Sequence, residues 1–299
     1  MLLLSYPGRG LGHLGVHLVA GLFQVPPDVV ASHIPMAAPI PESMAEVAHR
    51  KAIDKLMCEE SEPWISSCGY PVFDDDDGDV VNEKMAVSIE PGHHKPGTYG
   101  EVTTIGARQL FYHMGLSGTK EEVPEDEEGL VFMDLGSGVG KLVVQAFMEL
   151  PRISQAIGIE LAPVRHQHAL AAWKELEAAA SEVRKSREPV RDATLELLEA
   201  DIFDADLSKA THLYISSLCF SDAMMHRLAA KLEQEAPRLQ CVATLRAFPM
   251  SFRRKGILDR VSYEVVMKTL GMIERTEYVE MSWTKHTGRG CQVVIYTKP

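Results

Sequence analysis

The strongest constraint on the fold is an alternation of buried strands and amphipathic helices that begins at residue 130. The run LVFMDL (130–135) predicts a strand, a glycine-rich turn follows, and LVVQAFMEL (142–150) predicts a helix. The pattern continues with strands over 156–160, 195–201, 211–217 and 239–248, and with helices over 163–188 and 222–234. Such alternation is typical of a parallel sheet with helices on both faces.

The end of the chain follows a different pattern. The segments EYVEMSW (277–283) and CQVVIY (291–296) flank a KHTGRG turn, which predicts an antiparallel hairpin. A doubly wound parallel sheet that finishes with such a hairpin is the layout of class I S-adenosylmethionine-dependent methyltransferases. We therefore expect an α/β fold with a seven-stranded sheet of this class.

The segment before residue 98 has a different sequence pattern, which is interrupted by many proline and glycine residues. Only residues 41–58 show apolar positions near helical spacing. We therefore predict an N-terminal region over 1–97, irregular with at least one helix, and a methyltransferase domain over 98–299.

The net charge of −12 is concentrated in two short runs, DDDDGD (74–79) and EEVPEDEE (121–128). Without their eleven acids, 31 acidic residues remain against 30 Lys and Arg. The runs predict solvated loops or, as an alternative, an acidic surface that attracts a basic protein tail. Neither resembles the basic surface of a strong nucleic-acid binder.

Cysteine spacing and hydropathy argue against disulfide-bonded, zinc-binding and membrane-spanning proteins. Five cysteines without a CxxC pair favour free thiols over a disulfide framework or structural zinc, and the histidines lack partners at metal-ligand spacing, so we expect no metal. The longest nearly apolar stretch, Leu14–Phe23, contains a histidine and is half of the ~20 residues that cross a bilayer, so we expect no membrane span. The N-terminus has no acid before Asp28, which leaves organelle targeting open.

The glycine turn DLGSGVG (134–140) lies where a dinucleotide-binding loop would read GxGxxG, but Lys141 stands at the third glycine position. Glycines such as Gly136 and Gly138 let the backbone approach a ligand closely. The charge of Asp134 at the strand end would repel a pyrophosphate. It suits a cation such as the methionyl amine or the sulfonium of S-adenosylmethionine.

Two further acids follow the next strands. Glu160 ends the second strand, where a carboxylate can accept both ribose hydroxyls, and Asp201 ends the third, with Ile202 beside the adenine ring. The alternative is that Asp134 and Asp201 only cap turns. Because the carboxyl ends of parallel strands form the ligand crevice of such sheets, we predict S-adenosylmethionine as the cofactor.

Several motifs occur in the order and rough spacing of one family: YGEV (99–102), DLGSGVG (134–140), GIE (158–160), EADIF (199–203), SWT (282–284) and VVIY (293–296). Over about residues 99–296 the chain resembles the disruptor-of-telomeric-silencing (Dot-type, non-SET) histone-lysine methyltransferases. The resemblance implies that Tyr99 and Glu101 belong to a loop over the methionyl part of the cofactor. It also implies a cofactor site made of Asp134, Gly136, Gly138, Glu160 and Asp201. The channel that admits the target lysine would be lined by Phe220, Trp283 and Tyr296.

The chain departs from this family at two places. Ser216, Ser217 and Leu218 stand where the family has Asn-Asn-Phe, and the first of these positions lies at the methyl acceptor. Serine is shorter than asparagine and satisfies fewer hydrogen bonds. Lys141 replaces a glutamine in the cofactor loop.

The sequence thus predicts a protein-lysine N-methyltransferase that acts on a core histone in nucleosomes or on another protein. The departure at Ser216 leaves RNA, a small molecule or a non-lysine side chain open as acceptors, and a non-catalytic module that keeps the cofactor pocket is a further alternative. A histone-directed enzyme would work in the nucleus, and the others in the cytoplasm. The cluster Arg253, Arg254 and Lys255 reads equally as a solvated turn or a DNA contact.

Overall fold

The computed structural model describes residues 43–58, 64, 100–118, 128–187, 190–248, 252–254, 257–259, 271–284, 288 and 290–299. Its helices are α1 (Met44–Leu56), α4 (Thr104–His113), α5 (Lys141–Glu149), α6 (Pro163–Lys185) and α7 (Asp222–Glu235). The two acidic runs lie outside the described residues except for Glu128, as does most of the predicted N-terminal region.

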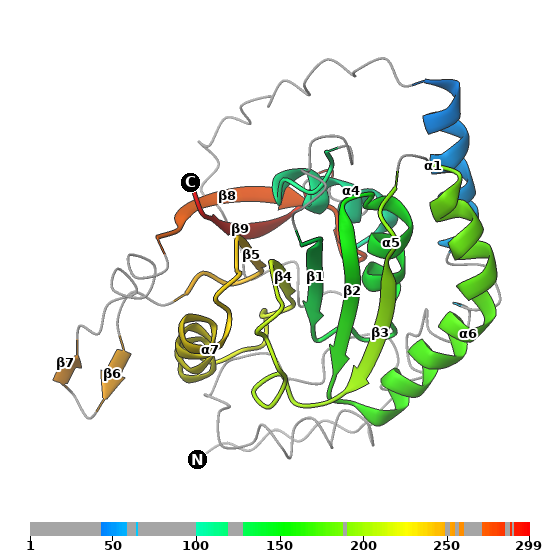
Figure 1. The fold of residues 1–299 in the computed structure, drawn as a ribbon. Coiled ribbons are helices and arrows are strands. Elements are labelled where there is room, and N and C mark those ends of the chain that lie inside the picture. Colours follow the sequence, from blue (N-terminus) through cyan, green and yellow to red (C-terminus); the bar gives the residue numbers. More distant parts are fainter. Residues whose placement is uncertain are drawn as a thin grey trace, which may run out of the picture. The chain divides into compact units, whose positions relative to one another are not determined.

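A seven-stranded sheet runs through the middle of the described part of the chain (Figure 1). Its order is β3-β2-β1-β4-β5-β9-β8, in which β1 to β5 are parallel and β9 pairs antiparallel with both β5 and β8. The strand bounds are β1 Leu130–Leu135, β2 Ile153–Glu160, β3 Thr194–Glu199, β4 His212–Ile215, β5 Cys241–Thr244, β8 Ile273–Val279 and β9 Cys291–Thr297. The order reverses between β1 and β4, and this switch point opens a crevice at the strand ends.

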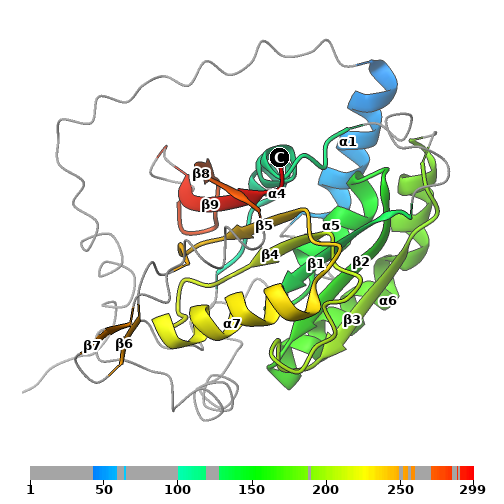
Figure 2. The ribbon, with the colours of Figure 1, turned by 60° about the vertical axis from the view of Figure 1, so that its left-hand side comes forward.

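Helices cover both faces of the sheet because its central strands are apolar on both sides. In β1, Phe132 points into one core cluster together with α4, α5 and α6, whereas Val131 and Met133 point into a second cluster with α7. Figure 2 shows α7 on the face opposite α5 and α6. All six residues of β1 are buried, as parallel strands between two helix layers require.

The structure confirms the predicted α/β fold class and its closing hairpin, with different element ends. The strand predicted over 239–248 is only Cys241–Thr244, and the hairpin strand predicted over 277–283 begins at Ile273 and ends at Val279. β3 ends at Glu199, so Asp201 lies two residues beyond it in a turn. Helix α4 was missing from the sequence prediction because its buried face consists partly of Gly106 and Ala107, which give little hydrophobic signal.

Helix α1 confirms the helix predicted over 41–58. It begins with a capping box in which Ser43 and Glu46 satisfy each other's backbone N–H groups. Its buried face carries Ile53, which lies in the same core cluster as α5 and α6, and the following Met57 joins that cluster. The helix therefore packs on the same layer as the helices that frame the glycine loop.

Two short strands, β6 (Phe252–Arg254) and β7 (Ile257–Asp259), form a separate antiparallel pair. No helix within the described residues is long and apolar enough to cross a membrane.

Candidate functional site

The glycine loop between β1 and α5 folds back onto β2. The backbone N–H groups of Gly136 and Ser137 both donate to the carbonyl of Ile159, at 2.8 and 3.0 Å. Gly136, Gly138 and Gly140 have φ of 91°, 56° and 81°, the left-handed region in which a side chain is strained. The glycines therefore fix a tight turn, and Gly140 is the N-cap of α5.

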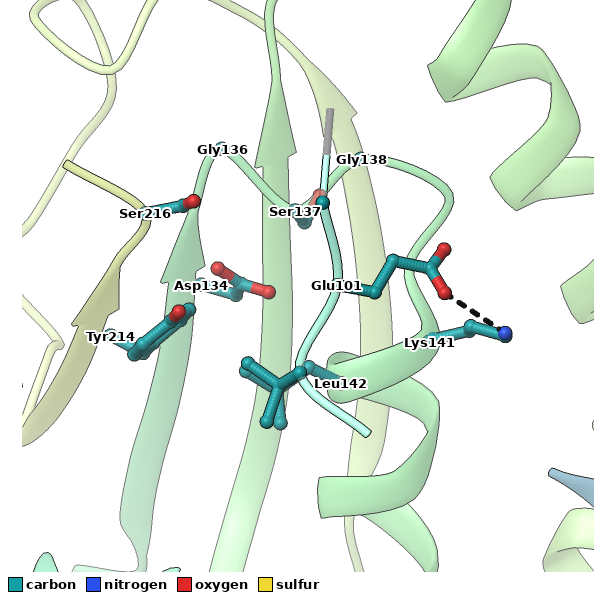
Figure 3. Close-up of a pocket in the computed structure, with 11 residues that line it drawn as sticks. Glu101, Asp134, Gly136, Ser137, Gly138, Lys141, Leu142, Tyr214 and Ser216 are labelled. Carbon is teal, nitrogen blue, oxygen red and sulfur yellow. Dashed lines mark hydrogen bonds and ion pairs between the residues drawn. The ribbon is translucent and has the colours of Figure 1, made fainter. Parts of the chain in front are cut away.

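A pocket lies at the sheet's switch point, beside the glycine loop (Figure 3). Six of its lining residues are predicted site residues, namely Glu101, Asp134, Gly136, Gly138, Lys141 and Ser216. The others are Gly100, Val102, Ser137, Leu142 and Tyr214. The structure thus brings together residues from the segment before α4, from the loop after β1 and from the end of β4.

Asp134 is the most unusual group of the pocket. Its side chain is buried, and within the described part of the chain its Oδ1 atom has no hydrogen-bond partner. Burial, together with the nearby charge of Glu160, raises the pKa of Asp134 from its usual 3.8 to about 8. An unpartnered buried carboxyl is costly, and a cation at this position would offset that cost.

Glu160, at the end of β2, is also buried, and it connects two parts of the site. Its Oε2 accepts from the N–H of Gly138 at 2.7 Å, and its Oε1 accepts from the N–H of Ala162 at 2.8 Å. Each carboxylate oxygen can accept more than one hydrogen bond, so both retain capacity for hydroxyl donors. Its predicted contact with the ribose stays a prediction.

Glu101 and Lys141 form an ion pair on one wall of the pocket, drawn as a dashed line in Figure 3. The Nζ atom of Lys141 lies 3.0 Å from Oε2 of Glu101. The pair places one carboxylate, of Glu101, and one ammonium group, of Lys141, beside the carboxyl group of Asp134. Such a set of charges suits a ligand that carries both a cation and a carboxylate.

The adenine part of the predicted site lies outside the pocket lining. The Oδ1 atom of Asp201 accepts a hydrogen bond from the N–H of Phe203 at 2.9 Å. This is the turn-capping role that the sequence predicts as the alternative. The Oδ2 atom does not take part in this bond. Ile202 is buried in the α7-side core. Tyr99 lies outside the described residues.

The loop after β4 carries Ser216, which the resemblance predicts to lie at the methyl acceptor. Ser216 lines the pocket, whereas Ser217 is fully buried, with its hydroxyl 2.6 Å from that of Thr244 at the end of β5. Arg246 donates to the carbonyl of Phe220 and to the carboxylate of Asp222. The loop is therefore fixed by the neighbouring strand.

Helix α7 begins at Asp222, as the sequence predicts, and ends at Glu235. Its N-cap is Ser221, whose hydroxyl accepts from the N–H of Met224 at 3.3 Å. Asp222 is the first helical residue, and its carboxylate pairs with Arg246.

The three predicted channel aromatics occupy two places. Phe220 and Tyr296 are buried in the α7-side cluster, and the hydroxyl of Tyr296 accepts from the N–H of Phe248 at 3.1 Å. Trp283 lies against Gly100, where an added Cβ would come within 2.4 Å of the indole ring. Trp283 therefore contacts the pocket wall through Gly100, and the channel role of all three stays a prediction.

Tyr214 was not predicted as a site residue. It pairs with Asp134 in the β1–β4 register, and the alternation of strand residues puts it on the same face as Ser216. Burial and the charge of Asp134 raise its pKa above the usual value. The signal that could have found it was its place two residues before Ser216. The structure shows no group of three potential metal ligands among the residues it describes.

The sheet order, the antiparallel β9, and acidic residues beside a glycine loop at the switch point define the class I S-adenosylmethionine-dependent methyltransferases. The orphaned carboxyl of Asp134 fits the cationic end of that cofactor. The sequence model described as "Histone methylation protein DOT1" matches residues 95–295, about two thirds of the chain. The chain belongs to this family, whose methyl donor is S-adenosylmethionine.

Solved structures are similar to the chain at low sequence identity. An RNA methyltransferase from Salinibacter ruber, in complex with S-adenosylhomocysteine, is 19% identical with a TM-score of 0.37, over 64% of this chain and 90% of that one. A Leishmania major SAM-dependent methyltransferase is 14% identical with a TM-score of 0.37, over 83% and 82% of the two chains.

A human methyltransferase 10 domain containing protein is 10% identical with a TM-score of 0.41, over 75% of this chain and 93% of that one. Similarity at this level does not extend to substrates or to individual residues. No curated protein sequence matches the chain.

Proposed function

We propose that this chain is a protein-lysine N-methyltransferase that acts on a lysine of a core histone or of another protein. The match to the histone methylation family over residues 95–295 supports this acceptor. The single observation that supports S-adenosylmethionine as the methyl donor is the buried Asp134, whose Oδ1 has no partner among the described residues, in a pocket that Glu101 and Lys141 also line.

In the proposal, residues of the pocket and residues beside it hold different parts of the cofactor. Asp134 and Glu101 face the cationic methionyl end, Glu160 accepts the ribose hydroxyls, and Asp201 with Ile202 holds the adenine. When bound, S-adenosylmethionine supplies an electrophilic methyl group. The protein's task is then to align the acceptor with that group and to exclude water, because methyl transfer is an in-line displacement.

A lysine acceptor must lose a proton before it reacts, since its ordinary pKa is ~10.4. An apolar channel lowers that pKa because it disfavours the charged amine. In the proposal Phe220, Trp283 and Tyr296 form this channel, and Ser216 accepts a hydrogen bond from the entering amine. No strong general base is required.

Ser216 is also the observation that favours a second candidate. The shorter side chain leaves more room at the acceptor position than the asparagine of the family, so a class I methyltransferase acting on RNA, a small molecule or another side chain is the alternative. A pocket that only recruits partners has no physical need for Asp134 in its costly buried state. We expect a histone-directed enzyme in the nucleus, and one with another acceptor in the cytoplasm.

The test is methyl transfer from radiolabelled S-adenosylmethionine to nucleosomes, free core histones, lysate protein and total RNA, each in a separate reaction. The proposal expects label on protein, released as methylated lysine after hydrolysis. Asp134→Asn serves as the matched control, because it keeps the side-chain shape and removes the charge. Label on RNA alone would favour the second candidate and refute the first.

A further inference from the structure

Lys141 occupies a position that is unfavourable for a cation. It is the first residue of α5, where the helix dipole is positive, and its side chain is only 8% exposed. Lysine is almost never buried without a partner. Two groups offset these costs, namely the carboxylate of Glu101 and the indole ring of Trp64, whose centroid lies 5.7 Å from the Nζ atom.

Trp64 precedes the part of the chain that matches the family, which begins at residue 95. Its ring is fully buried, and its Nε1–H donates to the carbonyl of Leu56, the last residue of α1, at 2.8 Å. Because α1 packs on the layer of α5, Trp64 is held on both sides, by α1 and by the core cluster that it shares with Ile53. The ring thus presents a fixed face to Lys141.

We propose that Trp64 is a positioning residue that holds the Lys141 ammonium toward the pocket, so that it binds the carboxylate of an α-amino acid group. The N-terminal segment thereby supplies part of the specificity of the cofactor site. The proposal rests on the proposed function, because the α-amino acid group is that of S-adenosylmethionine. On binding, Lys141 pairs with the ligand carboxylate and Glu101 with its ammonium.

The experiment compares two ligands by calorimetry at one pH and salt concentration: S-adenosylmethionine and decarboxylated S-adenosylmethionine, which keeps the amine and sulfonium but lacks the carboxylate. The chain is tested as wild type and as Trp64→Leu, Trp64→Phe and Lys141→Gln. Trp173→Leu is the matched control, since Trp173 is a partly buried indole that packs on Phe147.

We expect Trp64→Leu to weaken binding of S-adenosylmethionine about 3- to 30-fold, the range that cation–π contacts cover from exposed to desolvated sites. Binding of the decarboxylated ligand should change less than 2-fold. Trp64→Phe, which keeps an aromatic face, should retain most of the wild-type preference, and Trp173→Leu all of it. Lys141→Gln should reduce the preference for the carboxylate at least as much as Trp64→Leu does.

An equal loss for both ligands in Trp64→Leu would overturn the proposal, because it would show that Trp64 only supports the fold. If Trp64→Leu does not fold, Lys141→Gln decides: an unchanged ratio of the two affinities overturns the proposal. Failure of the wild-type chain to bind either ligand would instead refute the proposed function. The two failures are therefore distinguishable.

Discussion

We predict that the ionisation of Asp134 couples cofactor binding to pH. Below pH 8 this buried carboxyl is mostly protonated, because its pKa is raised to about 8 by burial and by Glu160. A ligand with an ammonium group needs the ionised form. We therefore predict that binding of S-adenosylhomocysteine releases a proton and strengthens as the pH rises.

The magnitude follows from the pKa. With a value of about 8, the ionised fraction of Asp134 rises from about 1% at pH 6.0 to about 24% at pH 7.5, so the affinity should increase about 20-fold over this range. At pH 7.0 about 0.9 proton should be released per ligand. Asp134→Asn should bind more weakly at pH 7.5 and show neither effect.

Stability of the ligand-free protein should change in the opposite direction. Since the pKa of folded Asp134 lies above its unfolded value, the stabilisation is complete below pH 4 and is lost as the pH rises to about 8. The loss is at most about 6 kcal/mol, because each pKa unit corresponds to ~1.4 kcal/mol. Asp134→Asn should therefore be the more stable protein at pH 8.

The assay is calorimetric titration in two buffers with different heats of ionisation, at several pH values between 6.0 and 7.5, with urea unfolding measured in parallel. The difference in apparent enthalpy between the buffers gives the number of protons released. A wild-type affinity that does not change with pH, with no proton release, would refute the assignment of Asp134 as the cation-binding group.

Three further predictions concern other residues. Glu160→Ala should weaken S-adenosylhomocysteine binding about 10- to 150-fold, the range of one charge-assisted hydrogen bond. An unchanged dissociation constant in calorimetry would refute the assignment of Glu160 as the acceptor of the ribose hydroxyls. Tyr296→Phe removes the acceptor of the Phe248 N–H, so it should lower the free energy of unfolding in urea by ~1–3 kcal/mol and leave cofactor affinity unchanged. Loss of that affinity would instead place Tyr296 in the cofactor site. Arg184→Met should destabilise the fold by ~3 kcal/mol or more. The guanidinium group donates to four backbone carbonyls, those of Phe147, Leu150, Ile153 and Arg191. An unchanged midpoint of urea unfolding would contradict this structural role.

The fold was predictable because two periodicities dominate the sequence after residue 130. Buried strands such as Leu130–Leu135 alternate with helices such as Pro163–Lys185, and parallel strands with crossover helices permit few arrangements. The acids at strand ends were predictable for the same reason, because the topology of such a sheet brings its strand ends together. Asp134 and Glu160 accordingly lie close enough for one charge to act on the other.

Other features of the site depend on contacts between residues far apart in the chain. The position of Trp64 over Lys141 follows from how α1 packs, and no local spacing encodes it. Likewise, Ser217 pairs with Thr244 because β4 and β5 are neighbours in the sheet. Nothing in the sequence near Asp134 indicates that its Oδ1 has no partner, since that depends on every surrounding group.

Cofactor binding at the switch point is tested most directly by titrating the well-folded wild-type chain with S-adenosylhomocysteine at pH 7.5, using adenosine as the reference ligand. We predict one binding site per chain and a clear preference for S-adenosylhomocysteine, because the acidic pocket is expected to bind the amino acid end as well as the nucleoside. No detectable heat with S-adenosylhomocysteine, or equal affinity for adenosine, would contradict it.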